Sequence, residues 1–438
     1  MGTQKTKRAM IIFYIILVIL VADFCMERIL DYLNSSCWSE QLPKELEGIY
    51  NEEKYRRSQH YFKDKQKVQL VTGTLTFLAM TSILVTGGIG WLDVLVHRFT
   101  MNPVLMALIF FGILGLVSSI LSIPFEWYRV FIVEQRYGFN TMTPLTFILD
   151  ILKGWLLGAL IGGGLVSLIV WIWDTTGNTF WLITWGVISG FQIFLLLFYS
   201  NIIVPLFNKQ KPLEEGYLRN AIQSFAAKTG FRLKDIYVMD GSKRSTKANA
   251  YFTGLGSKKR IVLYDTLVAK HSVGEIVAVL AHEIGHYKKR HTLQSLILSL
   301  LQTGLMLFIL SLFIQKNSAL SLAVCQALTG FSGIEIKQSF HLGILAFGIL
   351  YGPLSLILGL CMNKLSRRNE YAADRFSGLN NDPRALQDAL KKLSVDSLSN
   401  LKPHPLYVFF YHSHPPLLKR LSALTDLSCT LSSKPLQS

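Results

Sequence analysis

The sequence predicts a mainly α-helical membrane protein that carries a small α/β segment outside the bilayer, and three observations support this fold class. Half of the 438 residues are hydrophobic, while 44 Lys and Arg stand against 28 Asp and Glu, a combination that soluble proteins seldom show. One long polar stretch has the pattern of mixed helix and strand. Seven apolar segments are long enough to cross a bilayer, namely residues 10–25, 68–96, 103–124, 155–173, 180–204, 293–314 and 340–362.

The first five spans form an N-terminal membrane region, residues 1–204. Basic residues precede the first apolar run, as in a signal peptide, but no small-residue cleavage site follows it, so we expect a retained membrane anchor. Pro124 is expected to end the third span, because proline removes a helical hydrogen bond. Gly138 and Asn140 are turn formers, so the next helix is expected to end in a tight turn there.

The long polar stretch, residues 205–292, supplies the α/β segment. Gly254 and Gly256 within it are followed directly neither by a helix nor by a lysine at P-loop spacing, so they predict a hairpin turn and not a phosphate-binding loop. The expected elements are a helix near 213–229, a strand near 236–239, and a hairpin of strands 248–253 and 260–264. The remaining units are spans six and seven in 293–362, a second polar region in 363–425 and a disordered tail in 426–438.

The distribution of basic residues predicts how the spans are oriented. With seven crossings, the N-terminus and the even-numbered loops contain 6 Lys and Arg, whereas the odd-numbered loops and the C-terminus contain 38. Basic residues favour the cytoplasmic side of a membrane. The side that carries both polar regions, 205–292 and 363–425, is therefore expected to be cytoplasmic.

Composition and spacing exclude several function classes. The basic excess would also suit a nucleic-acid partner, but the sequence has no zinc-finger spacing, RNP-like aromatic cluster or basic helix, so no nucleic acid is expected. The five cysteines are scattered and odd in number, which indicates neither a disulfide framework nor a cysteine metal site. The lipid bilayer is the partner that composition indicates.

The segment Ala281–Tyr287 carries the strongest chemical signal. Ser272 and Glu275 form a capping-box pattern that predicts the start of a helix through this segment. In such a helix His282 and His286 lie on one face and can bind one zinc ion, and Glu283 beside them can reach a water on that ion. The alternative is a chance occurrence of the same letters. A third ligand decides between the two.

A carboxylate pair downstream supplies that third ligand. Glu370 and Asp374 lie four residues apart, so one can bind zinc while the other accepts the second ring N–H of a ligating histidine. Taken alone, the pair also suits a solvated charged helix. Two predicted crossings separate the histidines from Glu370, so both motifs emerge on the same side of the membrane.

With these residues in place, the chain resembles the type I CAAX prenyl endopeptidases, which are integral-membrane zinc metalloproteases. The matching segments occur in order along most of the chain. They include Leu42-Pro43, Tyr55-Arg56, Phe131–Asn140, Pro205–Asn208, Asn249–Phe252, His282–His286, Glu370–Asp374 and Tyr411–Pro416.

The resemblance implies a fold, a cofactor and roles for individual residues. The fold would be a barrel of seven long helices around a large water-filled chamber, with a small α/β zincin-like catalytic domain, made of 205–292 and 363–425, on the cytoplasmic face. One zinc ion per chain would be bound, and the site would hydrolyse a peptide or protein substrate. The implied roles are zinc ligands for His282, His286 and Glu370, general base for Glu283, support of a ligand for Asp374, substrate-backbone pairing for Asn249, Ala250 and Tyr251, oxyanion stabilisation for His414, and support of that region for Arg420.

Two of these roles also have a physical reading of their own. An exposed edge strand beginning at Ala250 can hold an extended peptide by strand addition, with little demand on its sequence. His414 can donate a hydrogen bond to a tetrahedral oxygen, although a loop histidine packed between Ser413 and Pro415 explains it equally well.

The function expected from this sequence is removal of C-terminal residues from prenylated CAAX proteins by a membrane zinc endopeptidase. A broader quality-control protease of the membrane without a strict prenyl requirement is the first alternative. A transporter or receptor with a structural metal clip is a remote one, because the polar residues gather in the extramembrane stretches and not within the spans. The expected location is the endoplasmic reticulum membrane in a eukaryote and the inner or plasma membrane in a bacterium.

Overall fold

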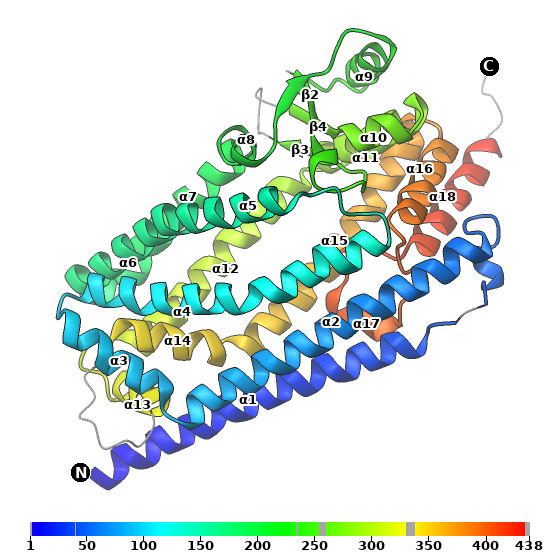
Figure 1. Cartoon of the computed structure of the whole chain (residues 1–438). Helices are drawn as coiled ribbons and strands as arrows, with labels where there is room; N and C mark the ends of the chain where they lie inside the picture. Colours follow the sequence, from blue (N-terminus) through cyan, green and yellow to red (C-terminus); the bar gives the residue numbers. More distant parts are fainter. Residues whose placement is uncertain (1, 40, 234, 254–259, 330–337, 434–438) are drawn as a thin grey trace.

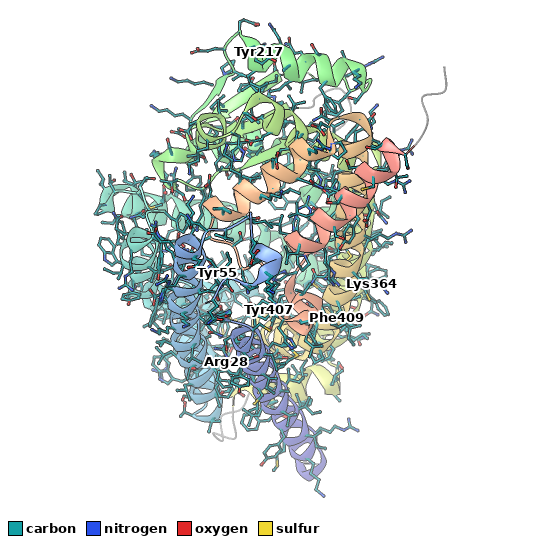
Figure 2. The ribbon with its side chains drawn as sticks, turned by 90° about the vertical axis from the view of Figure 1, so that its right-hand side faces the viewer. Arg28, Tyr55, Tyr217, Lys364, Tyr407 and Phe409 are labelled. Atoms are coloured by element: carbon teal, nitrogen blue, oxygen red, sulfur yellow. The ribbon has the colours of Figure 1, made fainter. Side chains whose placement is uncertain are left out.

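The protein is an elongated assembly of long helices with a small sheet at one end (Figure 1). The computed structural model describes residues 2–39, 41–233, 235–253, 260–329 and 338–433. In Figure 2, Tyr217 marks the sheet end of the molecule, while Arg28 and Tyr407 lie near its middle. The predicted mainly helical fold is therefore confirmed.

The N-terminal region begins with long helices. One predicted span, 68–96, is wrong as a single helix, because the chain breaks at Gly87, where φ is 72°. The break lets the helix that follows Gly87 pack tightly against Thr329. A Cβ at Gly90 in this helix would lie 2.5 Å from the carbonyl oxygen of Thr329. The helices are α1 (Gly2–Ser36), α2 (Glu52–Val85), α3 (Gly88–Phe99) and α4 (Pro103–Trp127), with a 3-10 turn at Lys44–Leu46.

Pro124 does not end its helix, contrary to the sequence prediction. α4 continues through it and runs directly into a π-helix, η2 (Tyr128–Glu134). The physical reason is that a bilayer offers no water to a freed backbone group, so a helix that relaxes locally into π geometry is favoured over one that stops. The predicted turn is confirmed: Gly138 has φ of 74°, and Phe139 N–H donates to the Glu134 carbonyl at 2.8 Å.

The next helical segment reverses direction at Gly177. Its φ of 56° is left-handed, which separates the two predicted spans 155–173 and 180–204. The indole of Trp185 on the returning helix donates to the Leu300 carbonyl at 2.8 Å and ties this segment to a later helix. The elements are α5 (Pro144–Leu157), π-helix η3 (Gly158–Gly162), α6 (Gly163–Thr176), a 3-10 turn at Gly177–Thr179, α7 (Phe180–Ile202) and α8 (Val204–Phe207).

The α/β region contains a four-stranded sheet in the order β1-β2-β4-β3. β2 and β4 are parallel, while β1 pairs antiparallel with β2 and β3 antiparallel with β4, so β3 is an edge strand. The predicted strands are thus confirmed, whereas the hairpin turn at 254–259 lies outside the described residues. The elements are β1 (Gln210–Pro212), α9 (Tyr217–Lys228), β2 (Asp235–Met239), a 3-10 turn at Gly241–Lys243, β3 (Ala250–Thr253), β4 (Arg260–Tyr264), α10 (Asp265–Lys270) and α11 (Val273–Lys288).

The chain then leaves the sheet end and comes back to it, as Figure 1 shows. α12 (His291–Ile314) runs away from the sheet to α13 (Ala319–Thr329), and the chain returns through α14 (Phe340–Leu350) and α15 (Gly352–Asn380). The predicted span 340–362 is not straight, because α14 and α15 meet at an angle of 52° where Gly352 and Pro353 follow Tyr351. The return brings Glu370 to the level of α11.

Five helical segments in the described parts of the chain are long and apolar enough to cross a membrane, or six if the bent α14–α15 pair counts as one span. One of the five is the whole stretch Pro144–Phe207, which contains the reversal at Gly177. The chain is therefore a multi-pass membrane protein.

The C-terminal helices pack beside α11 and α15. They are α16 (Pro383–Asp396), α17 (Pro405–Tyr411) and α18 (Leu417–Ser432). The prediction of a disordered tail from residue 426 is wrong up to Ser432, because α18 continues through these residues while its buried Leu417, Leu421 and Leu424 anchor the preceding turns. Residues 434–438 lie outside the described part of the chain.

Candidate metal centre

The helix that carries the two histidines forms as its sequence predicts. Ser272 and Glu275 make the capping box: Glu275 N–H donates to the Ser272 hydroxyl at 3.3 Å, and Ser272 N–H donates to the Glu275 carboxylate at 3.0 Å. Ile276, Leu280 and Ile284 are buried in the core that α11 shares with the sheet and α9. This packing fixes which face of α11 the histidines occupy.

α11 and α15 approach each other closely enough to place side chains from both helices in one site. The contact is made at Gly285, where a Cβ would lie 3.1 Å from both the Cα and the carbonyl oxygen of Ala373. The side chain of Ser377 donates to the Ala278 carbonyl at 2.9 Å and fixes the same pair of helices. A glycine at position 285 therefore sets the distance between the histidines and the carboxylates.

The three predicted ligands meet in one place. His282 Nε2 and His286 Nε2 lie 3.1 Å apart, and they are 3.4 and 3.3 Å from the two carboxylate oxygens of Glu370. One ligand atom from each residue lies within 4.8 Å of the others, so the three can hold a metal ion. His282 and Glu370 are buried, which shields a bound ion from water on their side.

Asp374 and Arg420 hold His282 from behind. Asp374 Oδ1 lies 2.8 Å from His282 Nδ1, and the Arg420 guanidinium donates two hydrogen bonds to Asp374, at 2.6 and 2.8 Å. Burial acts to lower the pKa of His282, but hydrogen bonds with Asp374 and Glu370 outweigh it and raise that pKa to about 9. The same arrangement leaves Nε2 as the ring nitrogen that faces the cluster.

Replacing Asp374 by Asn should therefore weaken metal binding without abolishing it. The amide carries no charge to support His282 or to pair with Arg420, and loss of such a partner lowers metal affinity about 10–100-fold. Metal affinity measured with a competing chelator checks this, and excess metal should restore activity. Asp388→Asn on α16, whose side chain is 61 % exposed, is the control. Unchanged affinity in Asp374→Asn would show that His282 does not depend on this contact.

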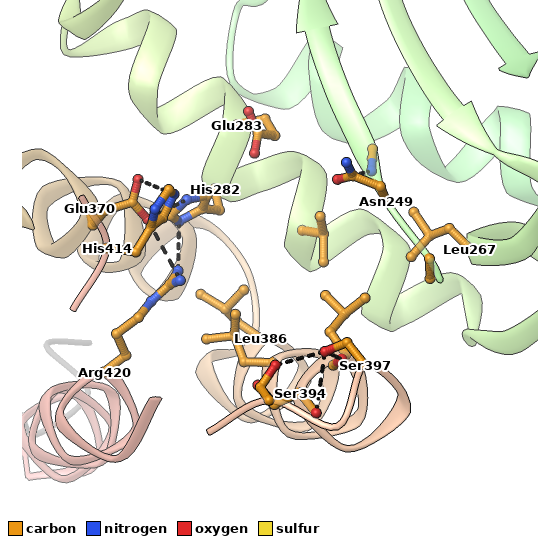
Figure 3. A pocket seen from close by; sticks show the side chains of 16 residues that line it. Asn249, Leu267, His282, Glu283, Glu370, Leu386, Ser394, Ser397, His414 and Arg420 are labelled. Carbon is orange, nitrogen blue, oxygen red and sulfur yellow. Dashed lines mark hydrogen bonds and ion pairs between the residues drawn. The ribbon is translucent and has the colours of Figure 1, made fainter. Parts of the chain in front are cut away.

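Glu283 lies on α11 between the histidine cluster and Asn249 (Figure 3). It lines two cavities, one on each side of the cluster. The first, of about 300 Å³, extends toward α10 and α16, and the second, of about 440 Å³, extends toward α12 and the membrane part of α15. The Glu283 carboxylate thus borders both of the cavities that the metal ligands line.

His414 also faces the cluster. Its Nε2 lies 3.3 Å from Glu370 Oε1, its Nδ1 lies 2.9 Å from the Ser413 hydroxyl, and its side chain is 64 % exposed. The exposed ring lines both cavities, whereas a histidine packed between its loop neighbours would be buried. His414 is therefore an exposed side chain beside the cluster, on the wall of both cavities.

The predicted substrate strand lies at the edge of the sheet, beside the first cavity. Tyr264 N–H donates to the Asn249 carbonyl at 3.0 Å, so the backbone groups of Ala250 and Phe252 point away from β4, toward the free edge. Ala250 N–H donates to the Asn249 side-chain oxygen at 2.8 Å. Asn249 and Ala250 line the first cavity, but the Tyr251 side chain points elsewhere, with its hydroxyl 3.3 Å from the Ser200 hydroxyl.

One histidine near the cluster was not identified from the sequence. His291, the first residue of α12, places Nδ1 3.1 Å from Nδ1 of His286 and is buried. The spacing of five residues does not match a helical face. The contact arises because α11 ends at Lys288 and the left-handed Arg290, with φ of 59°, redirects the chain. The only sequence signal was a histidine directly before a span.

Comparisons with known proteins agree along most of the chain. A family described as "CAAX prenyl protease N-terminal, five membrane helices" matches residues 32–209, and "Peptidase family M48" matches residues 212–428. "Probable CAAX prenyl protease 1" of Schizosaccharomyces pombe is 36% identical over 398 residues, which cover 88% of this chain and 82% of the relative. "CAAX prenyl protease 1" of Saccharomyces cerevisiae is 35% identical over 427 residues, which cover 93% of this chain and 94% of the relative.

A solved structure has the same fold. The crystal structure of S. mikatae Ste24p superimposes with a TM-score of 0.88 at 33% identity and covers 94% of this chain and 99% of the other. M48 peptidases are metallopeptidases, which agrees with the three ligands found here. The chain therefore belongs to peptidase family M48, among the CAAX prenyl proteases, and is a multi-pass membrane metalloprotease.

Proposed function

We propose that this protein is a zinc endopeptidase that removes the C-terminal residues of proteins with a prenylated cysteine near their C-terminus. The observation that carries the proposal is the meeting of His282, His286 and Glu370 beside Glu283 and an edge strand. Two imidazole nitrogens and one carboxylate with an open side are the donor set of catalytic zinc sites in peptidases. The relatives are named as CAAX prenyl proteases, which supplies the substrate class.

The residues around the ligands divide the chemistry between them. A zinc ion bound there would act as a Lewis acid that polarises the scissile carbonyl and acidifies water. Glu283 takes the proton of the attacking water and delivers it to the leaving amine nitrogen. His414 donates to the developing oxyanion from its exposed position. Arg420 keeps Asp374 in place against His282 and so holds the ligand still.

β3 holds the substrate backbone. An extended peptide that pairs with this edge meets the outward backbone groups of Ala250 and Phe252, and the Asn249 side chain releases Ala250 N–H when the peptide accepts that bond. Binding through backbone groups selects little by sequence. The same edge would also serve a quality-control protease of broad specificity, which is the second candidate function.

We also propose that the membrane region makes seven crossings around a chamber and that the α/β region has a zincin-like fold on the cytoplasmic side. Gly177 divides the stretch Pro144–Phe207 into two passes, and α12 and the α14–α15 pair leave the site and return to it. The excess of Lys and Arg on the site's side supports a cytoplasmic orientation. The proposed location is the endoplasmic reticulum membrane in a eukaryotic cell and the inner or plasma membrane in a bacterium.

Matched peptides with and without a farnesylated cysteine test the proposed function. The purified protein is expected to cut the farnesylated peptide directly after the modified cysteine, with an efficiency at least about tenfold above that for the plain peptide. Cut sites are mapped by mass spectrometry and rates are measured for both. Equal cutting of both peptides at scattered sites would contradict the prenyl role and favour the quality-control protease.

A further inference from the structure

A separate cavity of about 630 Å³, here named the α7 pocket, lies between the end of α7 and the sheet. It shares one lining residue, Phe252 of the edge strand, with the 440 Å³ cavity at the metal ligands. Its volume is within the range of about 300–1,000 Å³ that is typical of ligand sites. The lining residues are Leu195, Leu196, Tyr199, Ser200, Val204, Phe207, Asn208, Met239, Tyr251, Phe252 and Tyr264.

The lining of the α7 pocket suits an apolar ligand. It is made of aliphatic and aromatic side chains, and the described residues that line it include no Lys, Arg, Asp or Glu. Several of its polar groups already have partners: Asn208 Nδ2 donates to Asp240 at 3.0 Å, and the Tyr251 hydroxyl lies 3.3 Å from that of Ser200. The free surface of the pocket is therefore mostly hydrocarbon, which a lipid chain would cover favourably.

The sense in which a peptide pairs with β3 decides which of its parts lies beside this pocket, and we take the antiparallel sense that β3 itself has with β4. A peptide that pairs antiparallel with β3 runs from Phe252 toward Asn249. Its C-terminal part then lies in the first cavity, which Asn249 and Ala250 line. Its N-terminal part, which ends in the cysteine that precedes the cut, lies beside Phe252.

The pocket is also placed where a membrane lipid can reach it. Leu195, Leu196 and Tyr199 belong to the last turns of α7, which lies in a stretch apolar enough to span the membrane. Tyr199 is 53 % exposed, so the pocket wall on this side is not covered by protein. A chain that leaves the bilayer along α7 would enter the pocket before its attached peptide reaches the edge strand.

We infer that the α7 pocket is the binding site for the isoprenoid chain of the substrate cysteine. The inference rests on the proposed function and adds to it a binding site for the lipid. Two parts of the substrate would then bind at different places. The peptide backbone pairs with β3, while the lipid lies between α7 and the face of the sheet that carries Tyr251.

Filling the pocket tests the inference. Leu196→Trp in the zinc-loaded, full-length protein is expected to raise KM for a farnesylated peptide by at least about tenfold, while KM and kcat for the matched plain peptide stay unchanged. Leu196→Asn, which removes apolar surface without adding bulk, should raise the same KM to a smaller extent and serves if the Trp variant does not fold. Val71→Trp, in a different apolar groove between α2 and α4, is the matched control.

The outcomes separate this inference from the proposed function. A wild-type protein that cuts both peptides equally overturns the proposed function, and the pocket assignment falls with it. A wild-type preference for the farnesylated peptide that persists in both Leu196 variants overturns the pocket assignment alone. Equal loss of activity on both peptides also overturns it, because a lipid site would not affect the plain peptide.

Discussion

Glu283→Gln is expected to remove peptide hydrolysis while metal binding and folding remain intact. Glutamine has nearly the same shape, but its amide cannot take a proton from the attacking water. Loss of a general acid–base group lowers kcat by about 10²–10⁴-fold. His282, His286 and Glu370 are unchanged in this variant, so the metal content should equal that of the wild-type protein.

The measurement is the initial rate of peptide hydrolysis together with metal content by mass spectrometry. Glu215→Gln, at a side chain that is 79 % exposed in the segment before α9, is the control for a Glu-to-Gln change and should keep full activity. Normal turnover by the Glu283 variant would end its assignment as the general base. Loss of metal along with activity would instead make Glu283 a ligand or a structural residue.

Glu370→Ala is expected to deplete the protein of metal, and activity should fall with it. Glu370 is buried and lies within 3.4 Å of both histidine Nε2 atoms, so its loss removes the only carboxylate ligand of the group of three. Because removal of an outer partner already costs about 10–100-fold in affinity, removal of a direct ligand should cost more than about a hundredfold. The Arg420 guanidinium would also lose its ion pair with Glu370, in which the charged atoms lie 3.6 Å apart.

Metal content after dialysis distinguishes this result from general misfolding. Circular dichroism and gel filtration in detergent should match the wild-type protein, because α15 is fixed independently by Gly285 and Ser377. A folded Glu370→Ala protein that retains one metal ion per chain would show that the third ligand is another residue.

The site was predictable because its signals are local. His282, Glu283 and His286 read as one helical face because Ser272 caps the helix and an apolar stripe orients it. Glu370 and Asp374 could be assigned to the same site because two predicted spans separate them from the histidines. Two crossings return the chain to the same side of the membrane. Their contact depends on Gly285, whose role the sequence alone did not indicate, because a glycine inside a helix has no side chain to give a pattern.

The departures from prediction in the membrane helices have several causes, and one of them is that a membrane changes where a helix can end. Pro124 would end a helix in water, yet α4 passes through it into a π-helix. The break at Gly87 allows the close approach of Gly90 to Thr329, and that contact joins residues far apart in the chain, so local composition does not indicate it. Apolar composition predicts that a stretch is buried in lipid, but it does not report bends such as the one between α14 and α15.

In the C-terminal tail, the sequence analysis predicted less order than the structure has. The Ser- and Leu-rich composition of 426–438 suggested disorder, but hydrophobic residues of α18 pack on α15 and α16 and hold the helix together to Ser432. The contact of His291 with His286 was also not predicted from the sequence. It depends on the left-handed Arg290, and side-chain periodicity carries no signal for a single residue of that kind.

Stoichiometric metal reconstitution tests the central claim most directly. The protein is stripped with a chelator, zinc is added in steps, and hydrolysis of a farnesylated peptide is measured at each step alongside bound zinc. Negligible activity is expected without metal, followed by a linear rise that stops at one zinc per chain, with no rise in Glu370→Ala and bound but inactive zinc in Glu283→Gln. Full hydrolysis by protein that contains less than about a tenth of an equivalent of metal would contradict the assignment of His282, His286 and Glu370 as the catalytic metal site.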